Sequence, residues 1–493
     1  MADLLPAGVS IAHPTKLYIG GKWVAPKKGG VIEVVSPDTE EVVARVGEAS
    51  EADMDAAVAA AREAFDKGPW PRMSVAERGA YLRRMSKILS GRQTELAESY
   101  RNEIGALAGF AGMLTGAGTQ TLSAYADIGE GYPWIARQPS VAMPDHDAMI
   151  VREPAGVVAA IVPWNVPYSI MTQKIAPALI SGCTAIMKPS PETPLEAYLI
   201  AEAAEEAGLP PGVLNLVPSH RDAADYLVRH KGVNKVSFTG STAAGRRIAS
   251  VAGENMTRVT LELGGKSPAI LLDDMPTETA GKILGRTISM LSGQICAMLS
   301  RAIVPMDRYD DVAEAIATEM KKVRIGHSDD PQAEMGPIAM KRQLDRVEGY
   351  VAKGIEEGAT VYCGGRRPEH LNRGYFYEPT LFTNVDNKMT IAQEEIFGPV
   401  LCLIPARDLE HAIEIANDTT YGLNASVLTN DPEKVVEVGR RILSGNVAQN
   451  GMKADFTLPF GGFKMSGIGR EGGTEGIEPY IETKTILTQR ASA

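Results

Sequence analysis

Two residues of this chain could together carry out covalent chemistry on a carbonyl carbon. Cys296 lies in the segment Ser-Gly-Gln-Ile-Cys-Ala, and Glu262 lies upstream in Glu-Leu-Gly-Gly-Lys. A cysteine sulfur can attack a carbonyl carbon, and a carboxylate can accept the proton that such a reaction releases. An isolated cysteine is more often a buried inert thiol, and an isolated glutamate is usually a solvated surface group. The pair therefore indicates an enzyme only together with further motifs.

Two further motifs are typical of a nucleotide site. Gly240 and Ser241, in Phe-Thr-Gly-Ser, follow a predicted strand and open a predicted helix, whose N–H groups and dipole favour a phosphate. Lys188 and Ser190 follow another predicted strand, where they could donate to ribose hydroxyls. Taken singly, the glycine turn is more often a plain helix cap, and Lys188 is as easily a solvated loop lysine. At the Gly240–Ser241 turn neither the GxGxxG fingerprint nor a P-loop is present.

Short apolar runs alternate with amphipathic helices from residue 151 onward, which predicts parallel, doubly wound sheets. The first unit is predicted to have strands at Gly156–Val162, Thr184–Met187, Val213–Val217, Lys235–Phe238 and Val259–Leu263, with helices over 167–180, 194–207, 222–229 and 242–251. The second is predicted to have strands at Ala269–Leu272, Ala302–Val304, Val400–Ile404, Ala425–Leu428 and Asn446–Gln449, with helices over 277–291, 309–322, 338–357, 408–417 and 433–441. Glu262 ends the first unit and Cys296 belongs to the second, so we expect them to meet at an interdomain cleft.

The two ends of the chain carry further predicted elements. Residues 17–35 alternate apolar and polar residues around paired glycines, which predicts β-hairpin structure. Ser74 and Glu77 form a capping-box pattern that opens a helical stretch running to about residue 102. The segment Ile481–Leu487 alternates and is predicted to be a strand, whose partner lies within the chain or on another subunit.

Composition restricts the classes of partner. The 493 residues carry a formal net charge of −11, which argues against a nucleic-acid groove and an anionic membrane surface. No apolar run reaches the roughly 18 residues of a membrane span, and the N-terminus lacks the pattern of a secretion signal. The four cysteines form no CxxC pair, so neither a metal site nor a disulfide framework is expected. We therefore expect a cytoplasmic protein of roughly two or three domains.

Seven motifs in order closely resemble the aldehyde dehydrogenase superfamily. They are Pro163-Trp-Asn165, Lys188-Pro-Ser190, Phe238-Thr-Gly-Ser241, Glu262-Leu-Gly-Gly-Lys266, Gly293-Gln-Ile-Cys296, Glu394-Glu-Ile-Phe-Gly-Pro399 and Pro459-Phe-Gly-Gly-Phe-Lys-Met-Ser-Gly467. The resemblance covers nearly the whole chain, from Leu17 to Leu487. It implies the α/β fold of that superfamily, with two doubly wound parallel α/β domains and a small β oligomerisation flap.

The resemblance also implies domain boundaries and assembly. The cofactor-binding domain would comprise residues 1–130 and 150–262, the catalytic domain residues 263–465, and the oligomerisation segment residues 131–149 and 466–493. Members of the family are dimers or tetramers, so a homodimer or homotetramer is expected, with the C-terminal strand pairing with a partner subunit. Arg258, Arg470 and Glu482 match a charge cluster that links subunits and braces the cofactor site.

By resemblance, the chain is an NAD(P)-dependent aldehyde dehydrogenase of the hydrolytic, non-acylating type, with Cys296 as its nucleophile. Attack by the sulfur gives a thiohemiacetal, whose oxyanion the Asn165 amide and the Cys296 backbone N–H would hold. Loss of hydride to the nicotinamide leaves a thioester, and Glu262 would be the general base that activates water to release the free acid. Branches that pass the acyl group to coenzyme A lack this glutamate. Lys174 and Glu471 match positions that relay protons.

The resemblance assigns a dinucleotide site to ten residues. Glu395 matches a carboxylate that holds the nicotinamide ribose, Phe397 lies near the ring, and the Leu263 carbonyl could orient the carboxamide. The set is Ile161, Pro163, Trp164, Lys188, Ser190, Gly240, Ser241, Leu263, Glu395 and Phe397. Many members carry glutamate three residues after the cofactor lysine, where this chain has Pro191, followed by Glu192. NAD is therefore the expected cofactor, and NADP use stays open.

The substrate pocket implied by the resemblance is mostly apolar. It comprises Val166, Ile170, Met290, Ile295, Ala297, Asp455, Phe456 and Phe460. The absence of arginine argues against short dicarboxylic semialdehydes, so the expected substrate is a hydrophobic aldehyde of the aliphatic, terpenoid or aromatic type. Such a lining is equally typical of ordinary core.

Two other classes of protein contain the same residue types. A Cys-Glu-Lys amidase or nitrilase would use them without a cofactor, and the Phe-Thr-Gly-Ser helix start and Lys188 argue against it. A structural protein on a dehydrogenase scaffold is a further alternative, because fold does not fix function. The joint presence of Cys296, Glu262 and Asn165 argues for the enzyme, with a small-molecule aldehyde as its partner.

Overall fold

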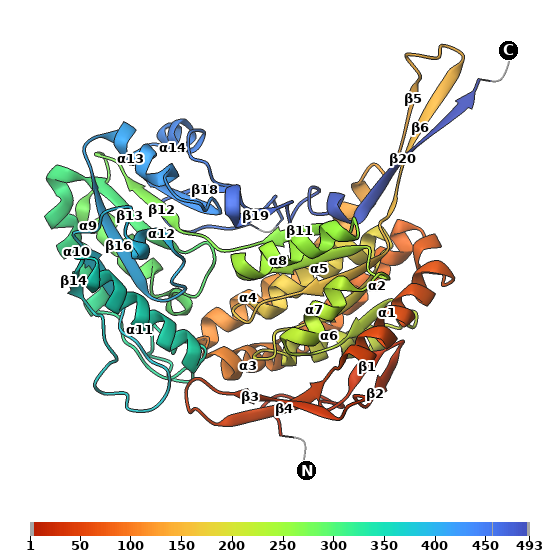
Figure 1. Cartoon of the computed structure of the whole chain (residues 1–493), viewed down its shortest axis with the longest axis horizontal. Coiled ribbons are helices and arrows are strands. Elements are labelled where there is room, and N and C mark those ends of the chain that lie inside the picture. The colour runs from red at the N-terminus through yellow and green to blue at the C-terminus, as the bar shows by residue number, and fades with distance from the viewer. Residues whose placement is uncertain (1–3, 456, 491–493) are drawn as a thin grey trace.

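Two helix-covered sheets with mostly parallel strands form the body of the molecule, and a narrow three-stranded flap projects from it (Figure 1). The structure is a computed structural model that describes residues 4–455 and 457–490. The predicted fold class is confirmed: two doubly wound α/β units and a small β flap. The parallel strands are flanked by antiparallel edge strands in both sheets.

The first sheet has eight strands in the order β19-β11-β10-β7-β8-β9-β1-β2. Its parallel strands are β7 (Val157–Ile161), β8 (Thr184–Lys188), β9 (Leu214–Leu216), β10 (Lys235–Thr239) and β11 (Arg258–Glu262), and its antiparallel edge strands are β1 (Leu17–Ile19), β2 (Lys22–Val24) and β19 (Gly467–Ile468). All five parallel strands were predicted. β7 is buried along its whole length between helices, which is why its sequence is one continuous apolar run.

Helices cover both faces of this sheet. On one face lie α1 (Glu51–Asp66), α7 (Arg221–Arg229) and α8 (Thr242–Glu254); on the other lie α5 (Pro167–Ser181) and α6 (Leu195–Glu206), backed by α2 (Val75–Gly91), α3 (Gln93–Ile104) and α4 (Ala108–Gly131). Ser74 caps α2 as predicted, since its hydroxyl accepts from the Glu77 N–H at 3.2 Å. The predicted continuous stretch to about residue 102 is two helices, because the backbone leaves the helical region at Arg92 (φ −108°, ψ 20°).

The predicted hairpin over residues 17–35 is partly confirmed. β1 and β2 form a hairpin about Gly20 and Gly21, which both have positive φ. β3 (Gly30–Val35) does not join them; it pairs instead with β4 (Val42–Glu48) in a separate two-stranded sheet.

The second sheet has seven strands in the order β14-β15-β16-β13-β12-β17-β18. The strands are β12 (Ser267–Leu271), β13 (Leu299–Pro305), β14 (Thr360–Cys363), β15 (Thr380–Thr383), β16 (Val400–Ala406), β17 (Asn424–Leu428) and β18 (Asn446–Gln449). The helices are α9 (Thr277–Thr287), α10 (Tyr309–Lys321), α11 (Lys341–Glu356), α12 (Thr390–Gln393), α13 (Leu409–Asn417) and α14 (Pro432–Gly439). β14 and β15 were not predicted. The predicted helix over 277–291 is wrong beyond residue 287, where a short 3-10 turn (Met290–Gly293) follows.

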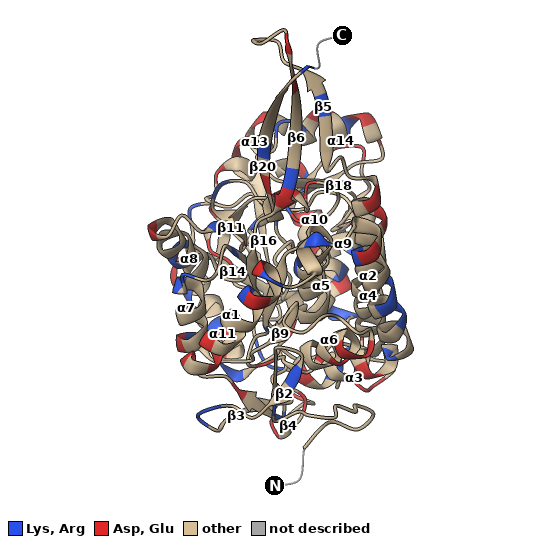
Figure 2. Cartoon of the chain, turned by 90° about the vertical axis from the view of Figure 1, so that its right-hand side faces the viewer, with Lys and Arg blue, Asp and Glu red and all other residues tan. Residues whose placement is uncertain are grey.

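The flap consists of β5 (Ile135–Pro139), β6 (His146–Pro154) and β20 (Ile481–Gln489), and it stands clear of the body in two perpendicular views (Figures 1 and 2). β20 pairs antiparallel with β6 over nine residue pairs, from Ile481 with Pro154 to Gln489 with His146. The C-terminal strand thus has its partner within the chain, whereas the resemblance had placed that partner on another subunit. β6 runs through residue 150 and β19 belongs to the first sheet, so both cross boundaries that the resemblance implied.

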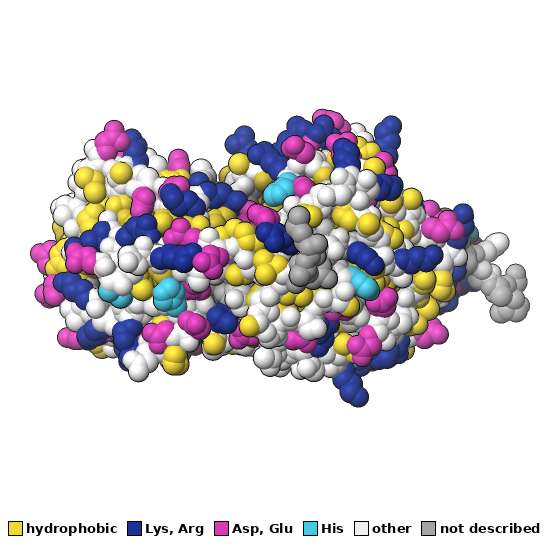
Figure 3. All heavy atoms as spheres, turned by 90° about the horizontal axis from the view of Figure 1, so that it is seen from below, with side chains coloured by type: hydrophobic (Ala, Val, Ile, Leu, Met, Phe, Trp, Pro, Cys, Tyr) yellow, Lys and Arg dark blue, Asp and Glu magenta, His cyan; other side chains and the backbone are white. Residues whose placement is uncertain are grey.

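The surface mixes charges of both signs. Lys and Arg positions alternate with Asp and Glu positions along the ribbon in Figure 2. On the face seen in Figure 3, side chains of both charges are mixed, with hydrophobic side chains between them in scattered groups. Within residues 4–455 and 457–490, every helix is too short or too polar to cross a bilayer.

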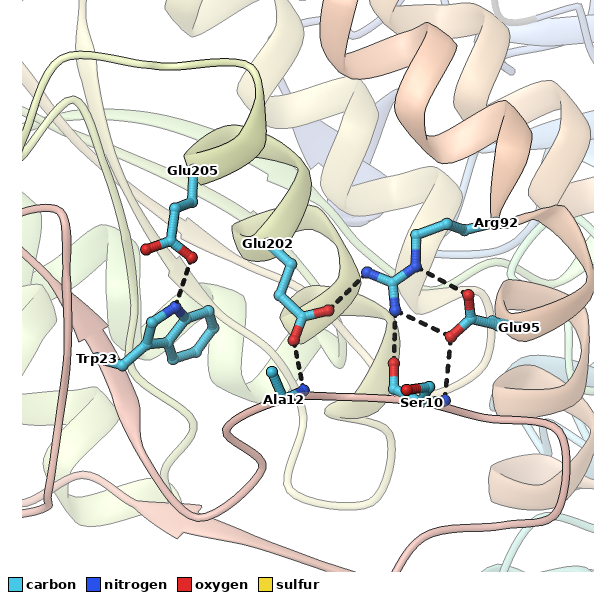
Figure 4. Close-up of polar contacts among 7 residues, drawn as sticks. All are labelled: Ser10, Ala12, Trp23, Arg92, Glu95, Glu202 and Glu205. Atoms are coloured by element: carbon cyan, nitrogen blue, oxygen red, sulfur yellow. Dashed lines mark hydrogen bonds and ion pairs between the residues drawn. The ribbon is translucent and has the colours of Figure 1, made fainter.

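The N-terminal segment is tied to the first unit by a network around Arg92, which lies between α2 and α3 (Figure 4). The Arg92 guanidinium donates to Glu95 and Glu202, at 2.9 and 2.5 Å. The same carboxylates accept from the backbone N–H groups of Ser10 and Ala12, at 3.0 and 2.7 Å. Arg92 therefore holds in place the two carboxylates that accept hydrogen bonds from the N-terminal segment.

Replacing Arg92 should loosen this segment. In Arg92→Ala the two carboxylates lose their cation, so we expect the amides of Ser10 and Ala12 to exchange with deuterium at least about tenfold faster. Lys67→Ala, which removes an exposed ion pair with Glu63, is the control and should leave these amides unchanged. Equal protection in wild type and Arg92→Ala would contradict the anchoring role.

Candidate active site

A left-handed turn positions Cys296. Leu291, Ser292 and Gly293 have φ values of 47°, 53° and 74°, and the Ser292 hydroxyl donates to the Gly336 carbonyl at 2.7 Å. A Cβ on Gly293 would lie 2.0 Å from the carbonyl oxygen of Gly398, so only glycine fits there. Two consecutive non-glycine residues in this region store strain that the packing must hold. The turn delivers Cys296, partly exposed, to the wall of a cavity of about 430 Å³.

Asn165 lies close to the cysteine loop. It follows β7 and is buried, and its side-chain N–H donates to the Gln294 carbonyl at 2.9 Å. Gln294 is held in turn, because its side-chain oxygen accepts from the Ala339 N–H at 2.9 Å. An amide carries two N–H donors, so one remains for a ligand oxygen. Asn165 and Cys296 line the same cavity, as the oxyanion assignment requires.

Glu262 ends β11 as a buried carboxyl group. Among the described residues, neither of its side-chain oxygens has a hydrogen-bond partner. Burial raises the pKa of Glu262 well above its usual range, and the charge of Glu471 adds to this effect. A buried carboxylate without partners is a strong proton acceptor, which suits a general base.

The two residues assigned to a proton relay form a buried ion pair. Lys174 Nζ, on α5, lies 2.5 Å from Oε1 of Glu471, and both side chains are buried. The Ser237 hydroxyl donates to the same carboxylate at 3.3 Å, and the Tyr480 hydroxyl donates to Ser237 at 3.0 Å. Glu471 acts on the pKa of Glu262, so the pair belongs electrostatically to the site.

Cys296 is a thiol rather than a thiolate near neutral pH in this environment. Burial raises the pKa of the Cys296 thiol, and the negative charges of Glu395 and Glu262 raise it further. Nucleophilic attack therefore needs a group that removes the proton as the bond forms. Glu262 is the candidate for this group because it is unpaired.

The ten residues assigned to a dinucleotide line two adjoining cavities. The cavity that contains Cys296 shares Trp164, Gly240, Ser241 and further residues with a second cavity of about 670 Å³. Pro163, Trp164, Gly240, Ser241, Leu263, Glu395 and Phe397 line the first; Ile161, Lys188 and Ser190 line the second, with some residues in both. Together the cavities form one elongated space beside the carboxyl ends of β7, β8 and β10, where ligands bind in such sheets.

The helix start in this space suits a phosphate. Ser241 caps α8 by accepting from the Ala244 N–H at 3.3 Å. A Cβ on Gly240 would lie 2.5 Å from the Phe238 ring, and one on Gly245 would lie 2.4 Å from Leu263, so a side chain at either position would displace that neighbour. Burial lowers the pKa of Lys188 to about 8. The donors and the space therefore fit a dinucleotide.

The far wall of the cavity comes from the second unit. Glu395 accepts from the Gly265 N–H at 3.2 Å, and burial raises the pKa of Glu395 to about 7. Phe397 has a φ of 62°, and its ring meets Trp164 of the first unit edge-on at 5.3 Å. The Trp164–Phe397 contact thus joins the two units across the space.

The residues assigned to substrate do not all gather at Cys296. Ile295, Ala297 and Phe460 pack around the cysteine with Leu423 and Met452. Met290 packs on the core of the second unit together with Ile295, Val166 is the N-cap of α5 and follows Asn165, and Ile170 packs on the core of the first unit. Asp455 is exposed and lines a separate cavity of about 640 Å³, and Phe456 lies outside the described residues.

Sequence reasoning missed three groups of lining residues. The third cavity is lined chiefly by α4, including Leu114, Gly118, Thr121 and Tyr125, and by Ser169 and Gln173 of α5. The nucleotide cavities include Arg342, Gln343 and Arg346 of α11, and Gln294 positions Asn165. The small residues spaced along one face of α4 indicated that another element packs closely against this helix. The sequence of α11 gave no such signal, because only tertiary contact brings that helix to the cleft.

Removing the Glu395 charge should make Cys296 more reactive. At pH 8 this carboxylate is ionised, so in Glu395→Gln the pKa of the thiol should fall and alkylation by iodoacetamide should become roughly two- to tenfold faster. Cys363, on edge strand β14, is an internal control whose rate should not change. Peptide mass spectrometry measures both rates, and an unchanged Cys296 rate would show that this charge does not reach the sulfur.

Known proteins resemble the chain over nearly its full length. The sequence model of the aldehyde dehydrogenase family matches residues 23–486. A geranial dehydrogenase of Castellaniella defragrans is 41% identical over 471 residues, covering 95% of this chain and 98% of that protein. A 3-succinoylsemialdehyde-pyridine dehydrogenase of a Pseudomonas species is 40% identical, covering 97% of this chain and 99% of that protein.

Solved structures agree with the fold. An aldehyde dehydrogenase of Mycobacterium tuberculosis, complexed with NAD⁺, superposes with a TM-score of 0.95 at 43% identity, covering 98% of this chain and 100% of that one. Aldehyde dehydrogenase C of Pseudomonas syringae, complexed with NAD⁺ and octanal, gives a TM-score of 0.93 at 39% identity, covering 97% and 98%. The chain therefore belongs to the aldehyde dehydrogenase family, a family of oxidoreductases.

Proposed function

We propose that this chain oxidises a hydrophobic aldehyde to the free carboxylic acid with NAD as electron acceptor. One observation carries the proposal: Cys296 and Asn165 share a cavity that continues into the dinucleotide space, with the unpaired Glu262 nearby. NAD is favoured because the cited solved relatives are complexed with NAD⁺. A cofactor-free amidase would have no use for the adjoining nucleotide space.

The residues divide the reaction between them. Cys296 Sγ bonds to the aldehyde carbon as Glu262 takes the thiol proton, and the negative oxygen is held by the Asn165 amide and the Cys296 N–H. NAD, when bound, supplies an acceptor for two electrons and one proton from that carbon. The carbonyl left on sulfur is a thioester. Glu262 first releases the thiol proton to solvent. It then takes a proton from water, whose oxygen attacks the thioester, and returns that proton to the departing sulfur, so that the free acid and the thiol are left.

The geometry suggests how the chain holds NAD. The Gly240–Ser241 helix start would receive the pyrophosphate, and Lys188 and Ser190 the adenosine ribose. Glu395 would accept from the nicotinamide ribose, with Phe397 beside the ring.

The substrate class rests on three observations. Ile295, Ala297 and Phe460 make an apolar wall at Cys296, and we infer that the aldehyde approaches through the separate cavity along α4. One relative is a geranial dehydrogenase, and another was solved with octanal. We infer an aliphatic, terpenoid or aromatic aldehyde; the hydroxyl and amide groups of Thr121 and Gln173 leave room for one polar substituent.

The proposed assembly is a homodimer or homotetramer. The flap projects from the body, and within the described residues β20 pairs on one side only, with β6. Such an open edge favours pairing with another chain. The proposed domains are residues 1–130 with 150–262, residues 263–465, and residues 131–149 with 466–493, and β6 and β19 cross the boundaries near residues 150 and 466.

A dehydrogenase assay tests the function directly. The purified protein should form NADH, followed at 340 nm, with octanal and geranial among a panel of aldehydes. In Cys296→Ala turnover should disappear while calorimetry still detects NAD binding, because the sulfur is not needed to hold the nucleotide. Turnover in this variant would rule out the nucleophile assignment.

Glu262→Gln should trap the acyl enzyme. Hydrolysis should slow by roughly 10²- to 10⁴-fold, so intact mass spectrometry should detect an acyl adduct on Cys296. In the wild type, hydrolysis should accelerate as pH rises through the elevated pKa of Glu262, and the variant should lack this rise. Glu394→Gln, which removes an exposed carboxylate next to Glu395 in the chain, is the control and should build up no adduct. Absence of an adduct in Glu262→Gln, at an unchanged rate, would place the base elsewhere.

A further inference from the structure

One ion pair crosses the cleft between the two α/β units at the nucleotide space. Arg342 Nη1, near the start of α11, lies 2.6 Å from Oε1 of Glu192, which follows β8 in the first unit. The Ser190 hydroxyl donates to the same carboxylate. Arg342 lines both nucleotide cavities, so its guanidinium lies where they join.

The charges around this point sum to a positive excess. Lys188, Arg221 and Arg342 contribute three cations, and Glu192 contributes one anion. Burial acts to raise the pKa of Glu192, but Arg342 and Ser190 together outweigh it and hold this pKa below its usual range. Asp225 and Arg247 line the same space, and they neutralise each other at 3.3 Å. The second cavity therefore favours an anion, although it contains the Glu192 carboxylate.

The identity of the dinucleotide is decided by the 2′ position of the adenosine ribose. A carboxylate there hydrogen-bonds the 2′-hydroxyl of NAD, and an arginine nearby accommodates the 2′-phosphate of NADP. This chain has both groups, paired with each other. We propose that Arg342 is a specificity-determining residue that binds the 2′-phosphate and allows the chain to use NADP as well as NAD. This inference rests on the proposed function.

Both cofactors can be received with small movements. With NAD, Arg342 stays on Glu192, and the carboxylate accepts from the ribose. With NADP, the arginine turns from the carboxylate to the phosphate, which its planar fork can bind through two N–H groups. The Arg342 side chain is 65% exposed, so nothing packed around it prevents the turn. Glu192 keeps its bond from Ser190 in either state.

Kinetics with the two cofactors test the proposal. The wild type should oxidise one aldehyde with NAD and with NADP. In Arg342→Ala, kcat/KM for NADP should fall at least about tenfold, and that for NAD should change less than about threefold, because only the phosphate loses a charged partner. Arg342→Lys keeps the charge but loses the planar guanidinium, so its kcat/KM for NADP should lie between those of the wild type and Arg342→Ala.

Two further variants separate contact from general charge. Arg247→Ala removes a second arginine of the same cavity and should change the NADP-to-NAD ratio less than about threefold. Glu192→Gln removes the anion that competes for Arg342 and should raise the ratio. If Arg342→Ala and Arg247→Ala lowered the NADP-to-NAD ratio of kcat/KM equally, a direct contact between Arg342 and the 2′-phosphate would be contradicted.

Calorimetry gives a readout that does not depend on turnover. 2′,5′-ADP carries the extra phosphate and 5′-AMP does not. Arg342→Ala should weaken binding of 2′,5′-ADP at least about tenfold and leave 5′-AMP unchanged, which also establishes that the variant is folded. A wild type that turns over NAD but neither uses NADP nor prefers 2′,5′-ADP would overturn this inference alone. A wild type that oxidises no aldehyde with either cofactor would instead overturn the proposed function.

Discussion

Four residues carry the chain from β11 of the first sheet to β12 of the second, and this short connection fixes the geometry of the cleft. They begin directly after Glu262 and include Gly264 and Gly265. A Cβ on Gly264 would lie 2.4 Å from a Glu395 oxygen, and one on Gly265 would lie 2.5 Å from the Cys296 carbonyl oxygen. The proposed base, nucleophile and ribose-binding carboxylate thus all touch or adjoin one tetrapeptide, so none can move far without the others.

Burial gives the site its electrostatic character. Glu262 and Cys296 are both held toward their neutral forms, whereas Lys174 and Glu471 compensate each other as a pair. Because burial disfavours the anion of each group, the proposed transfer of the thiol proton requires that the Glu262 carboxyl group is ionised beforehand. Ser237 and Tyr480 extend this polar group toward the base of the flap, whose strand β20 begins one residue after Tyr480.

The nucleotide space is shared between the units. The first contributes the helix start at Ser241 and the lysine at 188, and the second contributes Glu395, Phe397 and Arg342. Contacts such as Trp164 with Phe397 and Glu192 with Arg342 bridge the same gap. The relative position of the two units therefore decides which groups line the nucleotide space.

The sequence by itself determined most of the elements, and it predicted which residues make up the site at their ends. Alternating buried strands and amphipathic helices predicted all five parallel strands of the first sheet, and the motifs predicted Cys296, Glu262, Asn165 and the ten lining residues, because these signals are local. Tertiary structure alone decided the rest. The left-handed turn at Leu291 ends a predicted helix, since packing against Gly398 and Gly336 outweighs local propensity. The α4 wall, the Arg342 contact and the pairing of β20 with β6 join residues far apart in the chain, and no local pattern encodes such distances.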